Sequence, residues 1–285
     1  MSAFDLFVVI LMTVLAIIVI VPFYLSVVTA FVPEGEYIRN PVQFFPSKIT
    51  LANFQYIIDK CDLLSCYKNS IINTVLSVIV GLFFTLTMGY GLSFRNYPGR
   101  KLVFCLMVLT MFFGGGLLPD YLLAKNLHLT NTRWAVILWG GVNTFNVIIA
   151  KNNIENIPNE LKEAARIDGA NEVTVFAKVV IPLMKPTIVT FTLFFAVAAW
   201  NDYFWPTLML QSESLRTLPL MLRTLISTDT LNTSAFNASI SEDLRAFSEG
   251  IKMAGVLMTM LPIMCIYPFL QKHFAKGMLA GSIKS

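Results

Sequence analysis

The stretch IPNELKEAARIDGANEVTVFAKVVIPLMKP, Ile157–Pro186, is the longest mixed-charge segment in an otherwise apolar sequence. Pro158 suits the first position of a helix, where its missing N–H costs nothing. Glu160 and Glu163 follow in the first turns, where the positive end of the helix dipole favours carboxylates. Gly169 can adopt the left-handed conformation that closes many helices. These residues predict a first helix that ends near Gly169.

A second short helix is expected directly afterwards. Asn171 is of a residue type that caps helix N-termini, so this helix should begin there and run through Val180. Pro182 should end it, because proline lacks an N–H and its ring collides with the preceding turn. The stretch is therefore predicted to fold as helix, turn and helix.

One face of the first helix carries little side-chain bulk. Its members recur at the i, i+3, i+4 and i+7 positions that share a helix face, and they are Leu161, Ala164, Ala165 and Asp168. Two alanines leave a shallow stripe along the helix. Another protein can approach such a stripe closely.

The rest of the chain is too apolar for a soluble domain. Of the 285 residues 56% are hydrophobic and 13% are charged, and the mean hydropathy is +0.68. Six apolar runs are long enough for a helix that crosses a hydrocarbon core, and they cover approximately residues 4–32, 69–94, 102–123, 134–150, 187–210 and 251–270. Backbone groups in lipid must be bonded within the segment. The sequence therefore predicts an all-α membrane protein in which residues 1–285 form a single transmembrane domain.

Polar connections separate these runs. An outer loop at residues 33–68, with a short helix expected at 51–59, precedes the second run. The mixed-charge loop occupies residues 151–186, a long outer loop occupies 211–250, and a tail covers 271–285. The first apolar run lacks a basic flank and is too long for the core of a cleavable signal peptide, so we expect it to stay as a span.

Charge and metal-ligand content exclude several functions. The net charge is +4 without any run of basic residues, which argues against a nucleic-acid partner. Two histidines, far apart in sequence, are too few for a histidine-rich metal site. Cys61 and Cys66 share the outer loop, where they can form a short disulfide or remain two thiols.

Motifs for several enzyme classes are missing. The sequence holds no G-x-x-x-x-G-K-[ST] phosphate loop, and the dipeptide Gly-Lys does not occur in it. It also lacks H-E-x-x-H, C-x-x-C and G-x-S-x-G. The chain is therefore not expected to be an enzyme, and any ATP that drives it must be bound by another chain.

Three consecutive glycines, Gly114, Gly115 and Gly116, interrupt the third apolar run, and Pro119 follows them. Each glycine inside a helix costs up to about 1 kcal/mol relative to alanine. The glycines predict a break in the helix, a close approach between helices, or a hinge.

Polar residues inside the fourth and fifth runs are candidates for a site. The fifth run ends in Trp200-Asn201-Asp202-Tyr203-Phe204-Trp205-Pro206, and an ionisable residue within a span is a functional candidate by default. The alternative is a belt of aromatic residues at the outer interface, with Asp202 reaching water. Asn143 and Asn146 in the fourth run raise the same question, as do Asn69 and Asn73 in the second. Such asparagines can instead bond one helix to another.

Several fixed offsets in the mixed-charge stretch resemble the EAA loop of ABC-transporter permeases. Glu163-Ala164-Ala165, Asp168-Gly169-Ala170, Phe176 and Ile181-Pro182 have that loop's order and spacing. The resemblance implies that this loop lies in the cytoplasm and seats on a separate ATPase. It assigns ATPase coupling to Glu163, Ala164, Ala165, Asp168, Gly169, Ala170 and Pro182.

Other stretches narrow the resemblance to the maltose-type carbohydrate uptake permeases. They are the N-S-x-x-N pattern at Asn69–Asn73, WNDYFWP in the fifth run, and a glycine-rich tail with Gly277, Gly281 and Lys284. FFGGGLLPDYLL and NTRWAVIL are similar to the branch associated with complex oligosaccharides in Gram-positive bacteria.

This resemblance implies a set of partners. They are a second, unlike permease subunit, two ABC ATPase subunits that carry the Mg-ATP, and an extracellular sugar-binding protein, with the tail reaching the ATPases. No cofactor is expected on this chain. Sugars need hydrogen-bonding amides and aromatic faces, so we expect Asn143, Asn146, Asn201, Asp202 and Tyr203 along the substrate path.

The resemblance also implies a bacterial plasma-membrane protein with both termini in the cytoplasm. Charge agrees with this orientation, because the short turn between the second and third runs carries Arg95, Arg100 and Lys101. The N-terminus departs from many relatives in lacking basic residues before the first span.

Three other readings stay open at this point. The chain can serve an ABC importer for another solute, such as an amino acid, phosphate or a metal. It can be an ion-driven secondary transporter, although that class calls for inverted repeats and paired buried carboxylates, which the sequence lacks. It can also be a membrane scaffold whose docked helix is its whole role.

Overall fold

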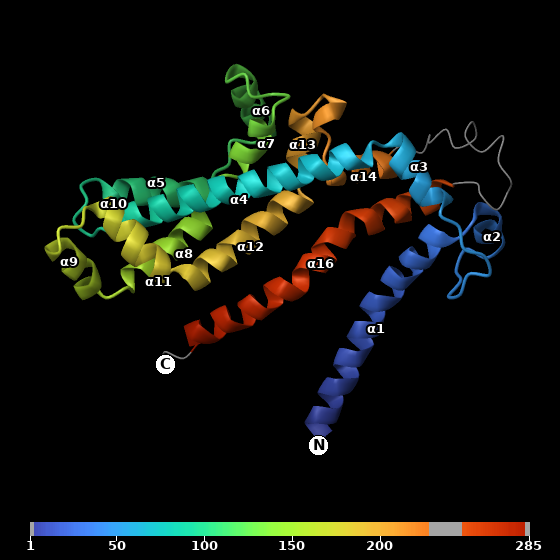
Figure 1. Ribbon diagram of the computed structural model, residues 1–285, viewed down its shortest axis with the longest axis horizontal. Coiled ribbons are helices and arrows are strands. Elements are labelled where there is room, and N and C mark those ends of the chain that lie inside the picture. Colours follow the sequence, from blue (N-terminus) through green and yellow to red (C-terminus); the bar gives the residue numbers. More distant parts are fainter. Residues whose placement is uncertain (1–2, 228–246, 283–285) are drawn as a thin grey trace. The chain divides into compact units, whose positions relative to one another are not determined.

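The computed structural model describes residues 3–227 and 247–282, and the side chains up to residue 265 within them. Every regular element in these ranges is a helix (Figure 1). The all-α prediction is therefore confirmed. The chain divides into two compact units, one of Met1–Cys66 with Met221–Cys265 and the other of Tyr67–Leu220 with Ile266–Ser285.

The first unit is built from α1 (Ala3–Phe31), α2 (Glu34–Arg39), α3 (Ala52–Lys60) and the first part of α16 (Ser248–Ser282). The α3 helix confirms the short helix expected at 51–59. Asn53 on α3 is buried, and its side chain joins two other segments. The amide nitrogen donates to the carbonyl of Ala30 at 3.0 Å, and the amide oxygen accepts from the backbone N–H of Phe247 at 3.2 Å.

The possible disulfide of this unit is not formed. Cys66 is buried and its thiol donates to the carbonyl oxygen of Cys61 at 3.7 Å, so the two sulfur atoms are not joined. Of the two alternatives that the sequence allowed, the structure has the pair of thiols.

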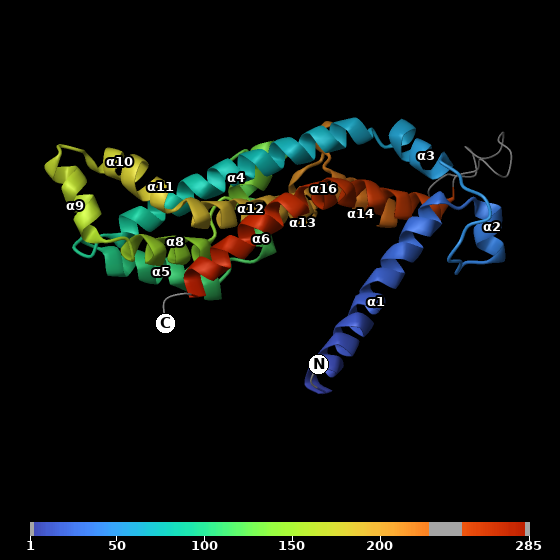
Figure 2. The ribbon, with the colours of Figure 1, turned by 60° about the horizontal axis from the view of Figure 1, so that its bottom comes forward.

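The second unit begins within α4 (Leu63–Ser93). In chain order the helices that follow are α5 (Arg100–Phe112), α6 (Leu117–Asn126), α7 (Arg133–Trp139), α8 (Thr144–Glu155), α9 (Asn159–Ile167), α10 (Glu172–Val175), η1 (Phe176–Val180), α11 (Ile181–Leu183), α12 (Lys185–Asn201), α13 (Phe204–Met209) and η2 (Glu213–Leu215). The start of α14 (Leu218–Ser227) also belongs to this unit, and its residues from Met221 onward belong to the first unit. The remainder of α4 runs alongside α5, α8 and α12 (Figures 1 and 2).

A buried apolar cluster holds α4, α8 and α12 together. Its fully enclosed members include Leu86 on α4, Ile154 on α8, and Phe191 and Phe195 on α12. Gly81 on α4 faces Phe195 so closely that a Cβ at this position would lie 2.6 Å from the ring. Small residues at such crossings let membrane helices approach closely.

The helices of the described residues do not form six unbroken spans. Two of them, Phe4–Phe31 and Leu63–Ser93, are long and apolar enough to cross a membrane, and the number rises to five if each bent helix pair counts as one span. The runs predicted at 102–123, 134–150 and 187–210 are therefore wrong as continuous helices. Each contains a break. The bent pairs that fall in the first two of these runs turn by 120° and 53°, and the third run is interrupted between Asn201 and Phe204. A third bent pair, which turns by 83°, has its break before this run, between Leu183 and Lys185.

Local sequence explains these breaks. The 120° bend falls at Gly114–Gly116, where Gly116 has φ of +89°. No atom lies within 4 Å of a Cβ placed on Gly114, so this segment is a break and not a close helix crossing. At the 53° bend, Asn143 caps the new helix by accepting from the N–H of Asn146 at 3.2 Å. The fifth run ends its first helix at Asn201, and α13 follows after two residues.

The sixth predicted run and the tail belong to one helix. α16 continues from Ser248 to Ser282, so it includes Gly277 and Gly281, which were expected in a separate tail at 271–285. Lys284 lies outside the described residues, as do residues 228–246 of the long loop predicted at 211–250.

The break at Gly116 gives a prediction with an internal control. Gly116→Ala should destabilise the protein by about 1–3 kcal/mol, because a side chain strains this positive-φ backbone. Gly114→Ala should leave stability within about 0.5 kcal/mol, because the site has open space and φ is not positive. Thermal unfolding of the two purified variants in the same detergent compares them, and equal loss in both would contradict the strain argument.

Candidate functional site

The mixed-charge stretch folds as a helix, a glycine turn and a second helix. α9 ends at Ile167, and Gly169 closes it with φ of +82°, while the N–H of Ala170 donates to the carbonyl of Ala165 at 3.0 Å. Asn171 then caps α10 through its side chain, which accepts from the N–H of Thr174 at 2.8 Å. Both the Gly169 turn and the Asn171 cap were predicted from the sequence.

Pro182 does not end the second helix, as the sequence suggested. The helix instead passes through a π turn, in which the N–H of Ile181 donates to the carbonyl of Phe176, five residues earlier. Proline supplies no N–H to the turn before it, and the wider π turn accommodates this loss. The helix breaks after Leu183, and α12 leaves at 83°. Pro158 likewise caps α9 from outside and does not occupy its first turn.

The small-residue stripe of α9 lies on the surface. Leu161, Glu163, Ala164 and Asp168 are exposed and Ala165 is half-buried. Two larger apolar side chains beside the stripe are also open, with Ile167 86% and Val173 74% exposed. Gly169 is exposed and Ala170 half-buried in the same turn. Six exposed or half-buried residues of α9, the turn and α10 are together called the docking face below: Leu161, Ala164, Ala165, Ile167, Asp168 and Val173.

The opposite side of α9 is fixed to the rest of the second unit at Lys162. This lysine is buried, and its ammonium donates to the carbonyl of Ile154 in the last turn of α8 at 2.8 Å. A cation at a helix C-terminus satisfies an open carbonyl and the negative end of the dipole. Burial, with Arg166 nearby, lowers the pKa of Lys162, and Glu155 opposes this effect.

A second attachment joins α9 and α10 to the end of α4. The carboxylate of Glu172 accepts from Arg166 Nε at 2.8 Å and from the hydroxyl of Tyr90 on α4 at 2.6 Å. The hydrogen bond to Glu172 raises the pKa of Arg166, which stays charged. The guanidinium of Arg166 also lies 5.9 Å from the ring centroid of Phe94, and Tyr90 contacts Phe94 and Phe176. Tyr90, Phe94, Arg166 and Glu172 are called the α4 linkage below.

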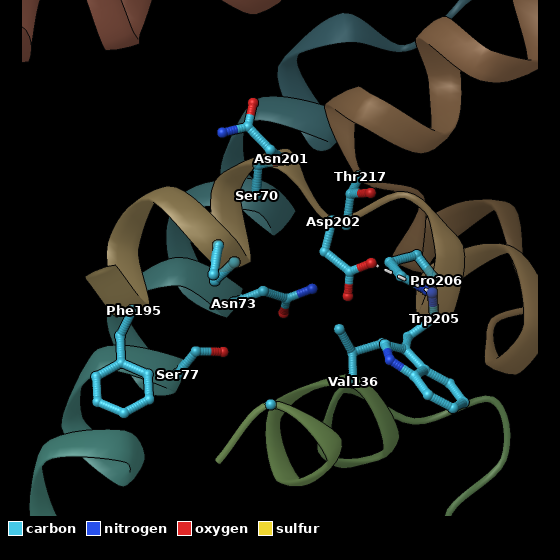
Figure 3. A pocket seen from close by; sticks show the side chains of 13 residues that line it. Ser70, Asn73, Ser77, Val136, Phe195, Asn201, Asp202, Trp205, Pro206 and Thr217 are labelled. Atoms are coloured by element: carbon cyan, nitrogen blue, oxygen red, sulfur yellow. Dashed lines mark hydrogen bonds between the residues drawn. The ribbon is translucent and has the colours of Figure 1, made fainter. Parts of the chain in front are cut away.

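Elsewhere in the second unit, polar groups gather at a cavity of about 290 Å³ (Figure 3). Its walls come from α4, α7, α12, α13 and the segment before α14. The lining residues are Ser70, Asn73, Ser77, Val136, Gly140, Phe195, Ala198, Ala199, Asn201, Asp202, Trp205, Pro206 and Thr217.

Two of the five residues predicted along a substrate path line this cavity, namely Asn201 and Asp202. Asn143 instead caps α8 and Asn146 is buried, so both serve the helix start in this structure. Tyr203 is exposed and does not line the cavity. The structure therefore brings only part of the predicted set together.

Asp202 combines two environments. One carboxylate oxygen, Oδ1, accepts from the N–H groups of Phe204 at 3.0 Å and Trp205 at 3.2 Å, so it starts α13. The other oxygen is directed toward the cavity, facing the amide of Asn73 (Figure 3). Asp202, for which the sequence left open both a functional site within the span and an interfacial position in contact with water, thus lines a cavity of the second unit.

Sequence reasoning missed Arg133 and Thr217, and it left open whether Asn69 and Asn73 hold a ligand or bond one helix to another. Arg133 donates to Asn69 Oδ1 at 2.6 Å and to Asn73 Oδ1 at 3.3 Å. Asn69 in turn donates to the carbonyls of Ser214 and Arg216 at 2.8 and 2.9 Å. An arginine directly after a turn and two asparagines four residues apart on one helix face were the available signals.

Asn131 fixes the beginning of the same outer segment. Its side-chain oxygen accepts from the N–H groups of Gln211 and Ser212 at 3.1 and 2.9 Å, and its own N–H donates to the carbonyl of Met209 at 2.7 Å. Asn131 adopts a positive φ of +57°, which asparagine tolerates better than most residues.

Comparison with known proteins decides the family. Residues 2–280 match the family model described as the binding-protein-dependent transport system inner membrane component. The chain belongs to this family. The resemblance to ABC-transporter permeases is thereby confirmed, and the chain is a multi-pass bacterial membrane permease by membership.

Its relatives cover nearly the whole chain. It is 41% identical to Protein LplC of Bacillus subtilis over 94% of this chain and 90% of the relative. It is 35% identical to the polygalacturonan/rhamnogalacturonan transport system permease protein YtcP of the same organism, over 99% and 98%. A chain in the crystal structure of a bacterial ABC transporter involved in the import of the acidic polysaccharide alginate matches with a TM-score of 0.87 and 28% identity, over 95% of this chain and 96% of that chain.

Proposed function

We propose that this permease is one of two unlike membrane subunits of an ATP-driven importer that moves an oligosaccharide by alternating access. The observation that carries the proposal is similarity over nearly the full length to permeases named for oligosaccharide or polysaccharide transport, including the arabinooligosaccharides permease AraQ of Halalkalibacterium halodurans at 31% identity. Two ATPase subunits holding Mg-ATP and an extracellular sugar-binding protein complete the complex. This chain binds no cofactor in the proposal.

The docking face of α9 is proposed to seat on an ATPase in the cytoplasm. Support comes from its exposure, from its small and apolar side chains, and from the charged bonds that fix the other side of the helix. Both termini are cytoplasmic in this orientation. The end of α16 near Gly277 and Gly281 is proposed to contact the same subunits, together with Lys284, which lies outside the described residues.

The fit of a whole helix face, and not a single ion pair, must couple the ATPase to the permease. Turning a two-state bundle from 1:99 to 99:1 requires about 5.5 kcal/mol of differential interaction. An exposed ion pair supplies only about 0–1 kcal/mol, so Glu163 on the surface cannot carry this alone. A whole helix face held in a cleft can, because apolar burial contributes about 25 cal/mol per Å².

Movement of α9 reaches the spans by two separate routes. Lys162 ties α9 to the end of α8, and the α4 linkage ties α9 and α10 to the end of α4. The cavity lies along α4 and α12, in the same unit. A displacement of α9 therefore acts on helices that line the cavity.

Transport by the purified complex tests the proposed function. Liposomes with the two permeases, the ATPases and the binding protein should take up labelled maltotriose, raffinose or trigalacturonate only when ATP is supplied to the ATPase side. An ionophore should not stop this uptake. Uptake of an amino acid but of no sugar, or uptake driven by an ion gradient without ATP, would contradict the proposal.

The docking face gives a mutational prediction. Ala164→Trp should leave the chain in the membrane but lower both co-purified ATPase and sugar uptake at least about tenfold, because a large side chain prevents close approach. Ala164→Gly keeps the face small and costs only about 1 kcal/mol of helix propensity, so uptake should stay near normal. Normal uptake by Ala164→Trp would rule out this face as the contact.

The α4 linkage gives a different result. A hydrogen bond to a charged group contributes about 1.5–3 kcal/mol, so Tyr90→Phe should weaken transmission and lower the sugar imported per ATP about tenfold while ATP hydrolysis continues. Tyr97→Phe is the control, because it removes the hydroxyl of an exposed tyrosine just beyond α4. A parallel loss of hydrolysis and uptake in Tyr90→Phe would mean that this tyrosine only stabilises the fold.

A further inference from the structure

Three side chains in the wall of the 290 Å³ cavity hold polar atoms that the protein leaves available. The hydroxyl of Thr217 and the amide nitrogen of Asn73 have no hydrogen-bond partner, although each residue is only 4% exposed. The cavity-facing oxygen of Asp202 is the third (Figure 3). Buried polar groups without partners are rare in folded proteins, and such a group calls for a specific explanation.

Asn73 is oriented as a donor. Its amide oxygen accepts from Arg133 at 3.3 Å, which fixes which end of the amide faces the cavity. The amide nitrogen therefore extends into the cavity toward Asp202 (Figure 3). Asp202 is oriented as an acceptor, since its Oδ1 is used by the backbone of α13.

Thr217 is held in place by its neighbours in the chain. The carbonyl of Arg216 accepts from Asn69 at 2.9 Å, and the N–H of Leu218 donates to the hydroxyl of Ser70 at 2.8 Å. Backbone bonds on both sides thus position a residue whose own hydroxyl makes none. A threonine hydroxyl can both donate and accept.

We propose that this cavity is a binding site within this subunit for one hydroxyl-rich sugar unit, with Asn73 donating to the unit, Asp202 accepting from it and Thr217 doing either. The inference rests on the proposed function and names the place of contact. Sugar hydroxyls each offer a donor and an acceptor, so a fixed amide N–H opposite a fixed carboxylate oxygen is a complementary pair. The half-buried ring of Trp205 adds an aromatic wall.

The size of the cavity sets how much of a glycan it holds. Pockets for small ligands usually measure about 300–1,000 Å³, so this cavity is at the lower limit. It accommodates one unit of a chain, and neighbouring units must extend out of it. An oligosaccharide would thus pass this site one unit at a time.

The first test compares two variants, each of which lacks one buried hydroxyl. Thr217→Val is nearly isosteric and deletes a hydroxyl that bonds to nothing in the protein, so a structural role predicts no loss. Thr85→Val is the matched control, because Thr85 is also fully buried with an unpartnered hydroxyl on α4 but does not line the cavity. In liposomes with the complete complex, Thr217→Val should lower the initial rate of ATP-driven uptake about tenfold, whereas Thr85→Val should not change it.

The second test does not depend on transport. A chain whose four cysteines are replaced by alanine receives Ala199→Cys, which lines the cavity, or Ala196→Cys, which is half-buried on the same helix outside it. In the purified complex, whichever of maltotriose, raffinose and trigalacturonate is transported should slow the reaction of a small thiol reagent with Ala199→Cys at least about threefold and should not affect Ala196→Cys.

The outcomes distinguish a wrong function from a wrong binding site. Failure of the unaltered complex to import any of the three sugars would overturn the proposed function itself. Normal import by the unaltered complex, together with normal import by Thr217→Val and no protection of Ala199→Cys, would overturn the binding site alone and leave a cavity that holds water only. Protection of Ala199→Cys supports the site even if Thr217→Val fails to assemble.

Discussion

Each backbone group that enters a membrane must find its hydrogen bond within the protein, and this constraint governs the second unit. Wherever a helix stops, nearby side chains or backbone turns must satisfy the exposed N–H and C=O groups. Asn143 does so for α8, Asp202 for α13, and Lys162 for the end of α8. These hydrogen bonds place amides, a carboxylate and an ammonium among apolar helices, where burying an unpaired polar group would cost free energy.

The same hydrogen bonds at helix ends shape both candidate sites, the cavity and the docking face. Asp202 caps a helix with one oxygen, and this geometry leaves the other oxygen directed into the cavity. Lys162 closes α8 and thereby holds α9 by its buried side, so the docking face points away from the unit. The same side chains thus complete the hydrogen bonds of helix ends and supply the polar groups of the candidate sites.

The sequence predicted the helical class, the helix-turn-helix of the mixed-charge stretch and the short helix at 51–59, because each depends on local residue preferences. It predicted the break at Gly114–Gly116 only as one of three alternatives, and it did not predict the breaks at Asn143 and Asp202. Hydropathy averages over the breaks at Gly116, Asn143 and Asp202, since the residues around them are apolar on both sides. The prediction that Pro182 ends the helix was wrong for a related reason. The π turn of five residues before it accommodates the missing N–H of the proline, and no local sequence pattern predicts such a turn.

The cavity could be predicted only in part. Asn201 and Asp202 stand out because they are polar within an apolar run, whereas Thr217 is an ordinary residue in a polar loop. Its position depends on contacts across 147 and 148 residues of sequence, in which Asn69 and Ser70 hold its two neighbours. Likewise Tyr90 and Glu172 are 82 positions apart, and nothing in either neighbourhood indicates the hydrogen bond between them.

The hydrogen bonds to residues 209–218 have a consequence for evolution. They come from Asn69, Ser70 and Asn131. They hold that segment by its main-chain N–H and C=O groups, which are the same for nearly every residue type. Apart from Ser212, whose hydroxyl accepts from the side chain of Asn131, its exposed side chains are therefore not needed for these bonds. Related permeases can vary such exposed residues without disturbing the cavity wall.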